Sequence, residues 1–329
     1  MAVRVVGDST SYLTPALIAE YEILEVSLAV VWNDRSVPEL EITDLDAFYT
    51  ELRDMKELPG TSQPSIGQFL EAYQPIIDAG DDIVSLHFSG GISGTYASAV
   101  QAKQQLERDG VDPLRMTVID TGSACAGYGA VLLAAAAAAK RGERHGDVVA
   151  AAQKMMDGLS FWFAVDTLEY LRRGGRVGSG AALVGGAIKI KPILTVNTEG
   201  IVPVEKVRTE SRVLARIADL AEENMPEGGG FLVQHAQAPE RAQKVINDLT
   251  YRFGRGPGFV SGEIGPVIGA LRSTLCTRIR RGPNAVVPRI SRSWFGCADD
   301  RPVELLSIIG PQGERMHVRA HPKKADTTS

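Results

Sequence analysis

A loop rich in glycine and small hydroxyl residues is the part of the sequence best suited to chemistry. Residues 89–95 read SGGISGT, follow the apolar run Ile83–Phe88 and lead into a helical pattern. The glycines let the backbone approach a ligand, and Ser93 and Thr95 place hydroxyls where unpaired helical N–H groups favour an anion. The loop therefore predicts binding of a carboxylate or phosphate, although serine and threonine are also ordinary helix caps.

Two further polar loops have a similar composition. Thr61 and Ser62 begin the segment TSQPS, which precedes another amphipathic helical pattern, and Asp8–Thr10 follows the first apolar run. Ligands of an open α/β sheet bind at the carboxyl ends of its strands, so a site shared by the loops at 61–65 and 89–95 is expected. Each loop taken alone is equally typical of a cap or a turn.

An enzymatic interpretation starts from Ser93. The segment GISGT resembles the nucleophile elbow G-x-S-x-G, with Thr95 in place of the last glycine. His87 and His235 are the histidines near predicted strand ends that such a serine would need as a base. Because the sequence contains no phosphate-binding P-loop and no G-x-G-x-x-G after the first strand, it favours binding over catalysis. A serine hydrolase or acyltransferase using Ser93, and a module for a sugar or phosphate, remain the alternatives.

Composition and charge exclude several other classes. The 329 residues are 44% hydrophobic and 23% charged, which is typical of a globular protein. The net charge of −5 argues against nucleic acid as a partner. The charge is uneven, because residues 271–329 hold eleven Lys and Arg against five Asp and Glu, whereas residues 1–270 hold 24 against 35.

Metal sites and membrane spans are not expected either. The cysteines, Cys125, Cys276 and Cys297, are too scattered for a zinc site, and no C-x-x-C or H-E-x-x-H occurs. The longest uncharged apolar stretch, Ala124–Ala139, has 16 residues and falls short of the roughly 20 that cross a bilayer. The N-terminal residues lack a signal-peptide pattern. A cytoplasmic protein without metal and without stable membrane insertion is predicted.

Strand and helix patterns alternate through the first half of the chain. This alternation predicts an α/β domain with a mostly parallel sheet and flanking helices. The predicted strands are Val3–Val6, Ile23–Val31, Ile83–Phe88 and Met116–Ile119, and the predicted helices are Asp44–Met55, Gly67–Ile77, Thr95–Glu107 and Ala124–Lys140.

The second half has a different pattern, typical of an α+β domain. Strands are predicted at Ser160–Val165, Ile188–Val196, Ile201–Val207, Phe231–His235 and Phe259–Ile264, and helices at Leu168–Arg172, Ser211–Glu223 and Pro239–Phe253. Periodicity weakens from Leu271 onward. We therefore predict an N-terminal domain at 1–157, a C-terminal domain at 158–284, and a basic, poorly structured tail at 285–329.

Arg176 is the candidate functional residue of the second half. It follows Gly174 and Gly175, whose backbone has wide conformational freedom. Its guanidinium can therefore reach an anion or a partner protein. A solvated surface arginine is the equally ordinary alternative.

The residues as an ordered set resemble the DegV family of bacterial fatty-acid-binding proteins. The matching blocks are Gly7–Thr10, Thr61–Ser65, Ile92–Tyr96, Asp120–Thr121, Thr167–Leu171 with Gly174–Arg176, Lys191–Leu194, Lys206–Arg208 and Ile264–Ala270. They occur in family order over residues 3–270, about four-fifths of the chain. No single block is decisive, but the ordered set is specific.

The resemblance implies a two-domain α/β protein that holds one long-chain fatty acid between its domains, with no other cofactor. Thr61, Ser62, Ser93, Gly94 and Thr95 are the implied ligand-binding residues around the carboxylate. The implied role is non-catalytic: the protein presents the acyl carboxylate to a separate fatty acid kinase, whose catalytic subunit uses ATP. Arg176 matches a basic position near the carboxylate end and is the implied partner-facing residue.

One departure from the family pattern falls near residue 270. Family members continue the segment at 264–270 with His-x-Gly-Pro-Gly, whereas this chain reads Leu271-Arg272-Ser273-Thr274-Leu275. Motif and composition change at the same point, which leads to the hypothesis of a frameshifted or diverged C-terminus. Resequencing the coding DNA tests it, because an intact single frame without a nearby insertion or deletion would favour divergence.

Overall fold

The computed structural model describes most of the chain up to residue 279 and two short segments beyond it. The described residues are 1–32, 35–55, 59–165, 168, 171–172, 174–176, 190–225, 229–258, 263–270, 273–279, 306–309 and 315–318. The chain divides into two compact units, Met1–Pro288 and Arg289–Ser329, and each is described by itself.

A four-stranded parallel sheet organises the first half of the larger unit. Its order is β2-β1-β6-β7, with β1 at Val3–Asp8, β2 at Leu24–Val26, β6 at Asp82–His87 and β7 at Met116–Asp120. All neighbouring strands are parallel, so their carboxyl ends meet at one edge. Five of the six residues of β6 are buried, as expected for a strand covered on both faces. The predicted parallel sheet is confirmed.

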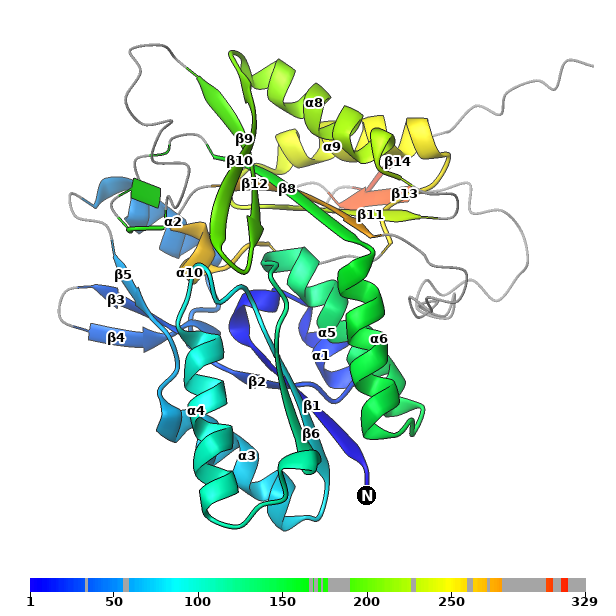
Figure 1. Cartoon of the computed structure of the whole chain (residues 1–329). Coiled ribbons are helices and arrows are strands. Elements are labelled where there is room, and N and C mark those ends of the chain that lie inside the picture. Colours follow the sequence, from blue (N-terminus) through cyan, green and yellow to red (C-terminus); the bar gives the residue numbers. More distant parts are fainter. Residues whose placement is uncertain are drawn as a thin grey trace, which may run out of the picture. The chain divides into compact units, whose positions relative to one another are not determined.

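Helices cover both faces of this sheet (Figure 1). The helices α3, Ile66–Asp78, and α4, Thr95–Arg108, pack on one face through an apolar cluster that includes Phe69, Ile83 and Leu106. The other face carries α1, Pro15–Glu20, α5, Cys125–Lys140, and α6, His145–Asp157.

The alanine-rich helix α5 packs against both halves of the larger unit. It contacts β1 and β6 of the first sheet and β8, β11 and β12 of the second half. Its small side chains allow close approach: a Cβ at Gly129 would lie 3.0 Å from the Ser11 carbonyl oxygen, and one at Gly127 would lie 3.3 Å from Phe161. The Ala and Gly content therefore reflects a helix that is packed on several sides. Among the helices of the described residues, none has the length and apolar character of a membrane span.

The predicted single strand Ile23–Val31 is wrong, because the chain forms two strands in different sheets there. After β2 it leaves the parallel sheet, and β3, Ala29–Trp32, pairs with β4, Arg35–Pro38, and β5, Gly60–Ser62, in a small antiparallel sheet. The break has a local cause: the Leu28 N–H donates to Ser9 Oγ (3.1 Å) instead of to a neighbouring strand. An apolar run of this length conceals such a change of partner.

The second sheet is antiparallel throughout and has the order β10-β9-β8-β12-β11. Its strands are β8, Leu159–Val165, β9, Lys191–Asn197, β10, Gly200–Val207, β11, Gly230–His235, and β12, Ser273–Ile279. Two helices, α8 at Glu210–Glu223 and α9 at Pro239–Phe253, lie over it (Figure 1). This arrangement confirms the predicted α+β architecture.

The strand β12 is the main element of this half that the sequence did not predict. It pairs with β8 on one side and β11 on the other, so it lies inside the sheet although periodicity is weak from Leu271 onward. The predicted strand Phe259–Ile264 has no counterpart at Ile264, and residues 259–262 lie outside the described residues. The predicted helix Leu168–Arg172 and the beginning of the predicted strand Ile188–Val196 also lie partly outside them.

The longest of the remaining elements is the helix α2, Leu45–Asp54. The others are the short helix α10, Pro266–Gly269, and the 3-10 helices Ser9–Ser11, Glu39–Glu41 and Pro113–Arg115. The smaller unit contains an antiparallel pair, β13 at Leu306–Ile309 and β14 at Arg315–Val318, within the segment predicted to be a tail. The predicted domain boundaries at 157 and 284 stay predictions.

Truncation after Asn284 is expected to leave the melting temperature within a few degrees of the full chain. The cut preserves β12 and removes residues whose sequence has no long apolar period, so we expect the loss of little buried surface. A thermal melt measures this. A fall of more than about 10 °C, several kcal/mol for a chain of this size, would show that the removed residues pack in the core. Truncation after Ala270 is the control: it deletes β12 and is expected to abolish cooperative unfolding.

Candidate functional site

The loop after β6 is held at each step by hydrogen bonds from its backbone. The Ser89 N–H donates to the Ser123 carbonyl (2.8 Å), and the Gly90 N–H donates to Asp120 Oδ1 (3.1 Å) at the end of β7. The Gly91 N–H donates to Ser89 Oγ (3.1 Å). The path of the loop is therefore fixed before it reaches Ser93.

Ser93, Gly94 and Thr95 form an open helix N-terminus. Ser93 Oγ lies 2.9 Å from Thr95 Oγ1 and accepts the Thr95 N–H (3.2 Å). The helix has no side-chain cap at Gly94, and within the described part of the chain the N–H groups of Ser93, Gly94, Tyr96 and Ala97 have no acceptor. This cluster of unused donors at a positive helix end suits an anion.

The loop carrying Thr61 and Ser62 adjoins this helix end. β5 brings both residues beside β3, where Thr61 pairs with Val30. The next residue, Gln63, lies against Gly94, since a Cβ at Gly94 would be 2.5 Å from Gln63 Nε2. The hydroxyls of Thr61 and Ser62 form no hydrogen bond within the described residues, so they are free to bind a ligand.

Ser65, the last residue of the same loop, has a different role. Its hydroxyl accepts the Gln68 N–H (3.2 Å), and the Gln68 side chain accepts the Ser65 N–H (2.9 Å). This reciprocal pair is a capping box for α3. The loop thus separates a capping serine from the two unbonded hydroxyls at 61 and 62.

Arg176 also approaches the Ser93 loop. Its Nε donates to the Ile92 carbonyl (3.4 Å), next to Ser93, and its Nη1 donates to the Gly174 carbonyl (2.5 Å). Arg176 thus lies beside the segment Ser93–Thr95, whereas Thr61 and Ser62 are linked to it through the next residue, Gln63, which contacts Gly94.

The turn between β9 and β10 packs on the same loop from the second sheet. Ser89 Oγ donates to the Asn197 carbonyl (2.5 Å), and a Cβ at Gly91 would lie 2.2 Å from the Gly200 nitrogen. Gly122, after β7, lies beneath Thr198 in the same way. Only glycine fits at position 91. The conformation of the loop therefore depends on how the two halves pack against each other.

The third polar loop, Asp8–Thr10, is part of the interior. Asp8, Ser9 and Thr10 are at most 4% exposed. Asp8 Oδ1 accepts from the Thr10 N–H (3.1 Å) and from Thr10 Oγ1 (2.6 Å). The structure thus supports the turn interpretation for this loop over a ligand site.

The two histidines considered as bases for Ser93 are engaged elsewhere. The His87 ring bonds to Asp8 (3.0 Å) and Ser85 (2.8 Å), and His235 Nδ1 accepts the Ala238 N–H (3.4 Å) and lies 3.5 Å from Glu263. The hydroxyl of Ser93 has only Thr95 as a partner within the described residues. Neither His87 nor His235 is therefore placed to act as a base for Ser93. No metal-binding group of three or more His, Cys, Asp or Glu occurs among the described residues.

Sequence reasoning missed a buried carboxyl group, Glu39, where the segment at 264–270 contacts the first half. Its Oε1 accepts from the Tyr12 hydroxyl (2.9 Å) and the Val267 N–H (2.8 Å), and its Oε2 accepts from Ser9 Oγ (2.5 Å). Burial is the main cause that raises the pKa of Glu39 to about 7. Nothing in the local pattern ELE distinguishes this residue from a surface glutamate.

Glu39 and two tyrosines hold the segment at 264–270 against the first half. The Tyr49 hydroxyl donates to the Ile264 carbonyl (2.7 Å), and the Ile268 N–H donates to the Tyr12 hydroxyl (3.1 Å). A Cβ at Gly269 would lie 1.6 Å from the Tyr49 hydroxyl, so glycine is required there. This segment is therefore fitted to the first half residue by residue.

Fold and site together define a class: an α/β protein of two joined sheets with an anion-accepting helix end at the edge of its parallel sheet. A family model described as an uncharacterised protein of the DegV family matches residues 2–271. The chain belongs to the DegV family. The match ends at the point where the sequence departs from the family pattern.

Curated relatives cover the same part of the chain. A DegV domain-containing protein of Streptomyces coelicolor is 38% identical over 275 residues, 82% of this chain and 94% of the relative. Protein DegV of Bacillus subtilis is 34% identical over 272 residues, 82% of this chain and 95% of the relative.

Solved structures share the fold and are described as fatty-acid-binding proteins. DegV from Bacillus subtilis, described as a fatty acid binding protein, matches with a TM-score of 0.74 and 32% identity, covering 85% of this chain and 100% of that chain. A DegV family protein from Thermus thermophilus, described by its fatty acid binding, matches with a TM-score of 0.75 and 26% identity, covering 85% and 99%.

Glu39→Gln is expected to flatten the fall in stability between about pH 4.5 and 7. The folded pKa of about 7 lies above the ordinary 4.5, so the stability contributed by protonated Glu39 is complete below pH 4.5 and lost by pH 7. The loss is at most about 3 kcal/mol, and glutamine mimics the neutral acid. Glu25, whose pKa burial also raises to about 7, is expected to leave part of the slope in the variant.

Urea unfolding from pH 4.5 to 8 measures this change. Glu41→Gln, on the exposed side of the same 3-10 helix, is the matched control. A pH slope in Glu39→Gln equal to that of the unmodified chain would show that Glu39 does not titrate as its burial predicts.

Proposed function

We propose that this chain binds one long-chain fatty acid and holds its carboxylate at the N-terminus of α4. The observation that carries the proposal is a set of donors at that end: the unused N–H groups around Gly94, the unbonded hydroxyls of Thr61 and Ser62, and the Ser93 hydroxyl, whose partner is Thr95. The family descriptions of solved relatives as fatty-acid-binding proteins support the same class of ligand.

The chemistry of a fatty acid matches such an end. A carboxylate removed from water needs several donors, because an unpaired buried charge is costly. Charge-assisted hydrogen bonds from hydroxyls and helix N–H groups provide them. Burial of the acyl chain contributes about 0.8 kcal/mol per CH₂, so the chain supplies most of the affinity and the polar end supplies orientation.

The role proposed for the complex is presentation of the carboxylate to the catalytic subunit of a fatty acid kinase, in the cytoplasm. The protein itself carries out no catalysis and needs no cofactor beyond the bound fatty acid. The hydrogen bond from Arg176 to the Ile92 carbonyl, next to Ser93, supports a partner-facing role for this arginine. The His-x-Gly-Pro-Gly motif is missing after Ala270, so one donor of the family pattern is absent from this site.

A lipid extract of the purified protein tests the ligand class directly. Chloroform extraction followed by mass spectrometry is expected to yield one long-chain fatty acid per chain. Turnover of an activated ester that Ser93→Ala abolishes would instead support a hydrolase. A phosphate or sugar ligand in place of the lipid would support the third alternative.

Ser93→Ala is expected to weaken fatty-acid binding about 10–150-fold, and Thr61→Val by a similar factor. Each hydroxyl that donates to a carboxylate contributes roughly 1.5–3 kcal/mol. The double variant should lose less than the sum, since both groups share one ligand. The methyl ester carries no charge, so it should bind poorly and respond little to either change.

Titrating acid and ester against these variants measures the preference. Ser65→Ala is the matched control from the same loop: it removes the α3 cap, lowers stability by about 0.5–2 kcal/mol, and should leave the acid/ester ratio unchanged. An unchanged ratio in Ser93→Ala would remove Ser93 from the carboxylate site.

Arg176→Glu is expected to reduce ATP-dependent acyl phosphate formation by a fatty acid kinase subunit while leaving the bound lipid nearly unchanged. The reason is that the acyl chain dominates retention, whereas Arg176 stands at the rim of the polar end. Arg255→Glu, an exposed arginine after α9, is the matched charge reversal. Loss of lipid with retained kinase coupling would contradict the assignment.

A further inference from the structure

We propose that His87 is a positioning residue for the Ser93 loop: by donating from Nδ1 to Asp8, it orients the carboxylate that holds the first N–H of the loop. The proposal rests on the proposed function, because the loop it positions is the one assigned to the fatty-acid carboxylate. His87 itself does not contact the ligand, so its effect is indirect.

The pair lies in the interior at the carboxyl ends of β1 and β6. Both side chains are 0% exposed, and His87 Nδ1 lies 3.0 Å from Asp8 Oδ2. The same Oδ2 accepts the N–H of Phe88 (3.3 Å), the residue at which the chain leaves β6. Oδ1 is already occupied by Thr10. Each oxygen of Asp8 thus has two donors, and among the described residues His87 is the one side chain that bonds to Oδ2.

The rest of the hydrogen-bond chain assigns the protons. His87 Nε2 lies 2.8 Å from Ser85 Oγ, which lies 2.8 Å from the Tyr73 hydroxyl. Ser85 is the one partner of the buried Tyr73 hydroxyl among the described residues, so the phenol starts the chain as a donor to Ser85. Tyr73 then donates to Ser85, Ser85 donates to Nε2, and the proton on Nδ1 faces Asp8. The opposite tautomer would place a nitrogen lone pair against a buried carboxylate.

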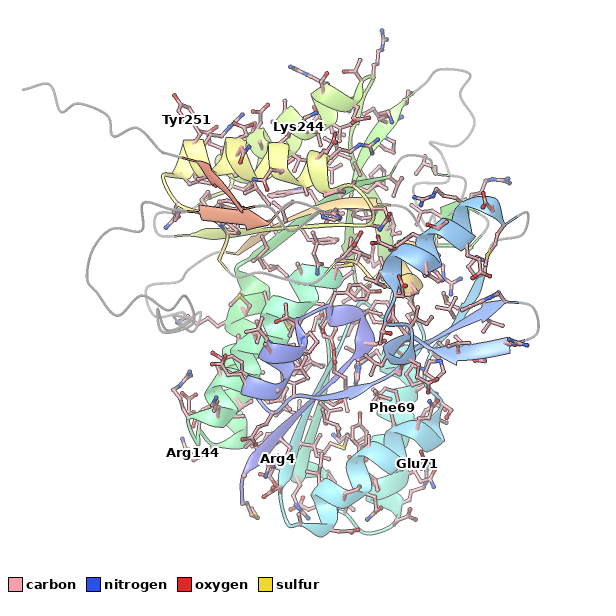
Figure 2. The ribbon with its side chains drawn as sticks, turned by 180° about the vertical axis from the view of Figure 1, so that it is seen from behind. Arg4, Phe69, Glu71, Arg144, Lys244 and Tyr251 are labelled. Atoms are coloured by element: carbon pink, nitrogen blue, oxygen red, sulfur yellow. The ribbon has the colours of Figure 1, made fainter. Side chains whose placement is uncertain are left out.

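Packing fixes the plane of the ring. Phe69 of α3 contacts the His87 ring edge to face, with centroids 5.0 Å apart and an interplanar angle of 78°. Figure 2 labels Phe69 on the inner side of α3 and Glu71 on its outer side. A ring held in this way cannot follow Asp8 if the carboxylate turns, so the hydrogen bond defines one orientation of both groups.

The N–H of Phe88 is the first of four successive backbone N–H groups with a fixed acceptor, followed by those of Ser89, Gly90 and Gly91. The His87 carbonyl accepts from Thr121, which directly follows β7 (2.9 and 3.0 Å). A loop with this many fixed points transmits a shift at its start to Ser93 and the free N–H groups beyond it.

Ser85, His87 and Asp8 have the chemical order of a catalytic triad but cannot act as one. All three are 0% exposed, and Tyr73 occupies the hydroxyl of Ser85. No substrate reaches that hydroxyl. The arrangement therefore positions a loop and performs no chemistry.

Two substitutions of His87 by an amide residue test the roles of the two ring nitrogens separately. In His87→Asn, the side-chain amide replaces Nδ1 and still donates to Asp8. In His87→Gln, the amide replaces Nε2, keeps a partner in Ser85 and leaves Asp8 without its donor. We expect fatty-acid affinity to fall about tenfold in His87→Gln and to recover to within about threefold of the unmodified chain in His87→Asn. The acid/ester ratio should fall in His87→Gln alone.

Binding is measured by titration at a temperature at which melts show both variants to be folded. Equal losses of affinity in the two variants, or an unchanged acid/ester ratio in His87→Gln, would overturn the positioning role. Absence of fatty-acid binding by the unmodified chain would overturn the proposed function instead. If the unmodified chain binds fatty acid and Ser93→Ala weakens that binding, the carboxylate site is intact. The His87 variants then test the positioning role alone.

Nitrogen-15 NMR of the unmodified protein tests the same proposal without a variant. Long-range correlation spectra assign the ring protons, and we expect Nδ1 of His87 to carry one. An unprotonated Nδ1 would overturn the proposal even if neither variant folds.

Discussion

The rest of the site depends on the hydrogen bonds that compensate the buried Asp8 carboxylate. A charge that is 0% exposed must be compensated inside the protein. Its donors come from the turn at Thr10, from His87 and from Phe88, which belong to the ends of β1 and β6. Satisfying one buried charge therefore brings two strand ends and the beginning of the ligand loop into a single geometry. The open end of α4 lies a few residues beyond that point.

The second constraint is the fit between the two halves of the larger unit. Gly91 lies against Gly200, and Gly269 lies against Tyr49, at separations that leave no room for a Cβ. Glu39 adds a buried carboxyl group that accepts from Val267 in the second half and from Ser9 in the first. Because Ser9 and Gly91 belong to the polar loops at the edge of the parallel sheet, docking of the halves and geometry of the loops are coupled. Ligand binding and association of the halves are then expected to stabilise each other.

Much of this arrangement is visible in the sequence, and the exceptions have physical causes. The loops at 61–65 and 89–95 are predicted from hydroxyl and glycine residues that precede helical patterns. Their proximity does not come from a common edge of parallel strands, because β5 belongs to the small antiparallel sheet, and it is the contact of Gln63 with Gly94 that joins the two loops. The strand β12 was missed because its pairing with β8 and β11 is long-range, while its own residues show little alternation. The run Ile23–Val31 concealed a change of sheet that a hydrogen bond to Ser9 imposes. Glu39 could not be found either, since its burial is decided by residues 228 positions away.

The central claim, that a fatty-acid carboxylate is bound at the N-terminus of α4, is tested most directly by carbon-13 NMR of carboxyl-labelled palmitate added to the delipidated protein. Helix N–H groups and hydroxyls stabilise the ionised form, so the bound resonance should remain that of a carboxylate below the pH at which a carboxyl in water is protonated. In Ser93→Ala this lowering of the pKa of the bound carboxyl should disappear. A bound resonance that titrates like the free acid, or one that Ser93→Ala leaves unchanged, would contradict the account.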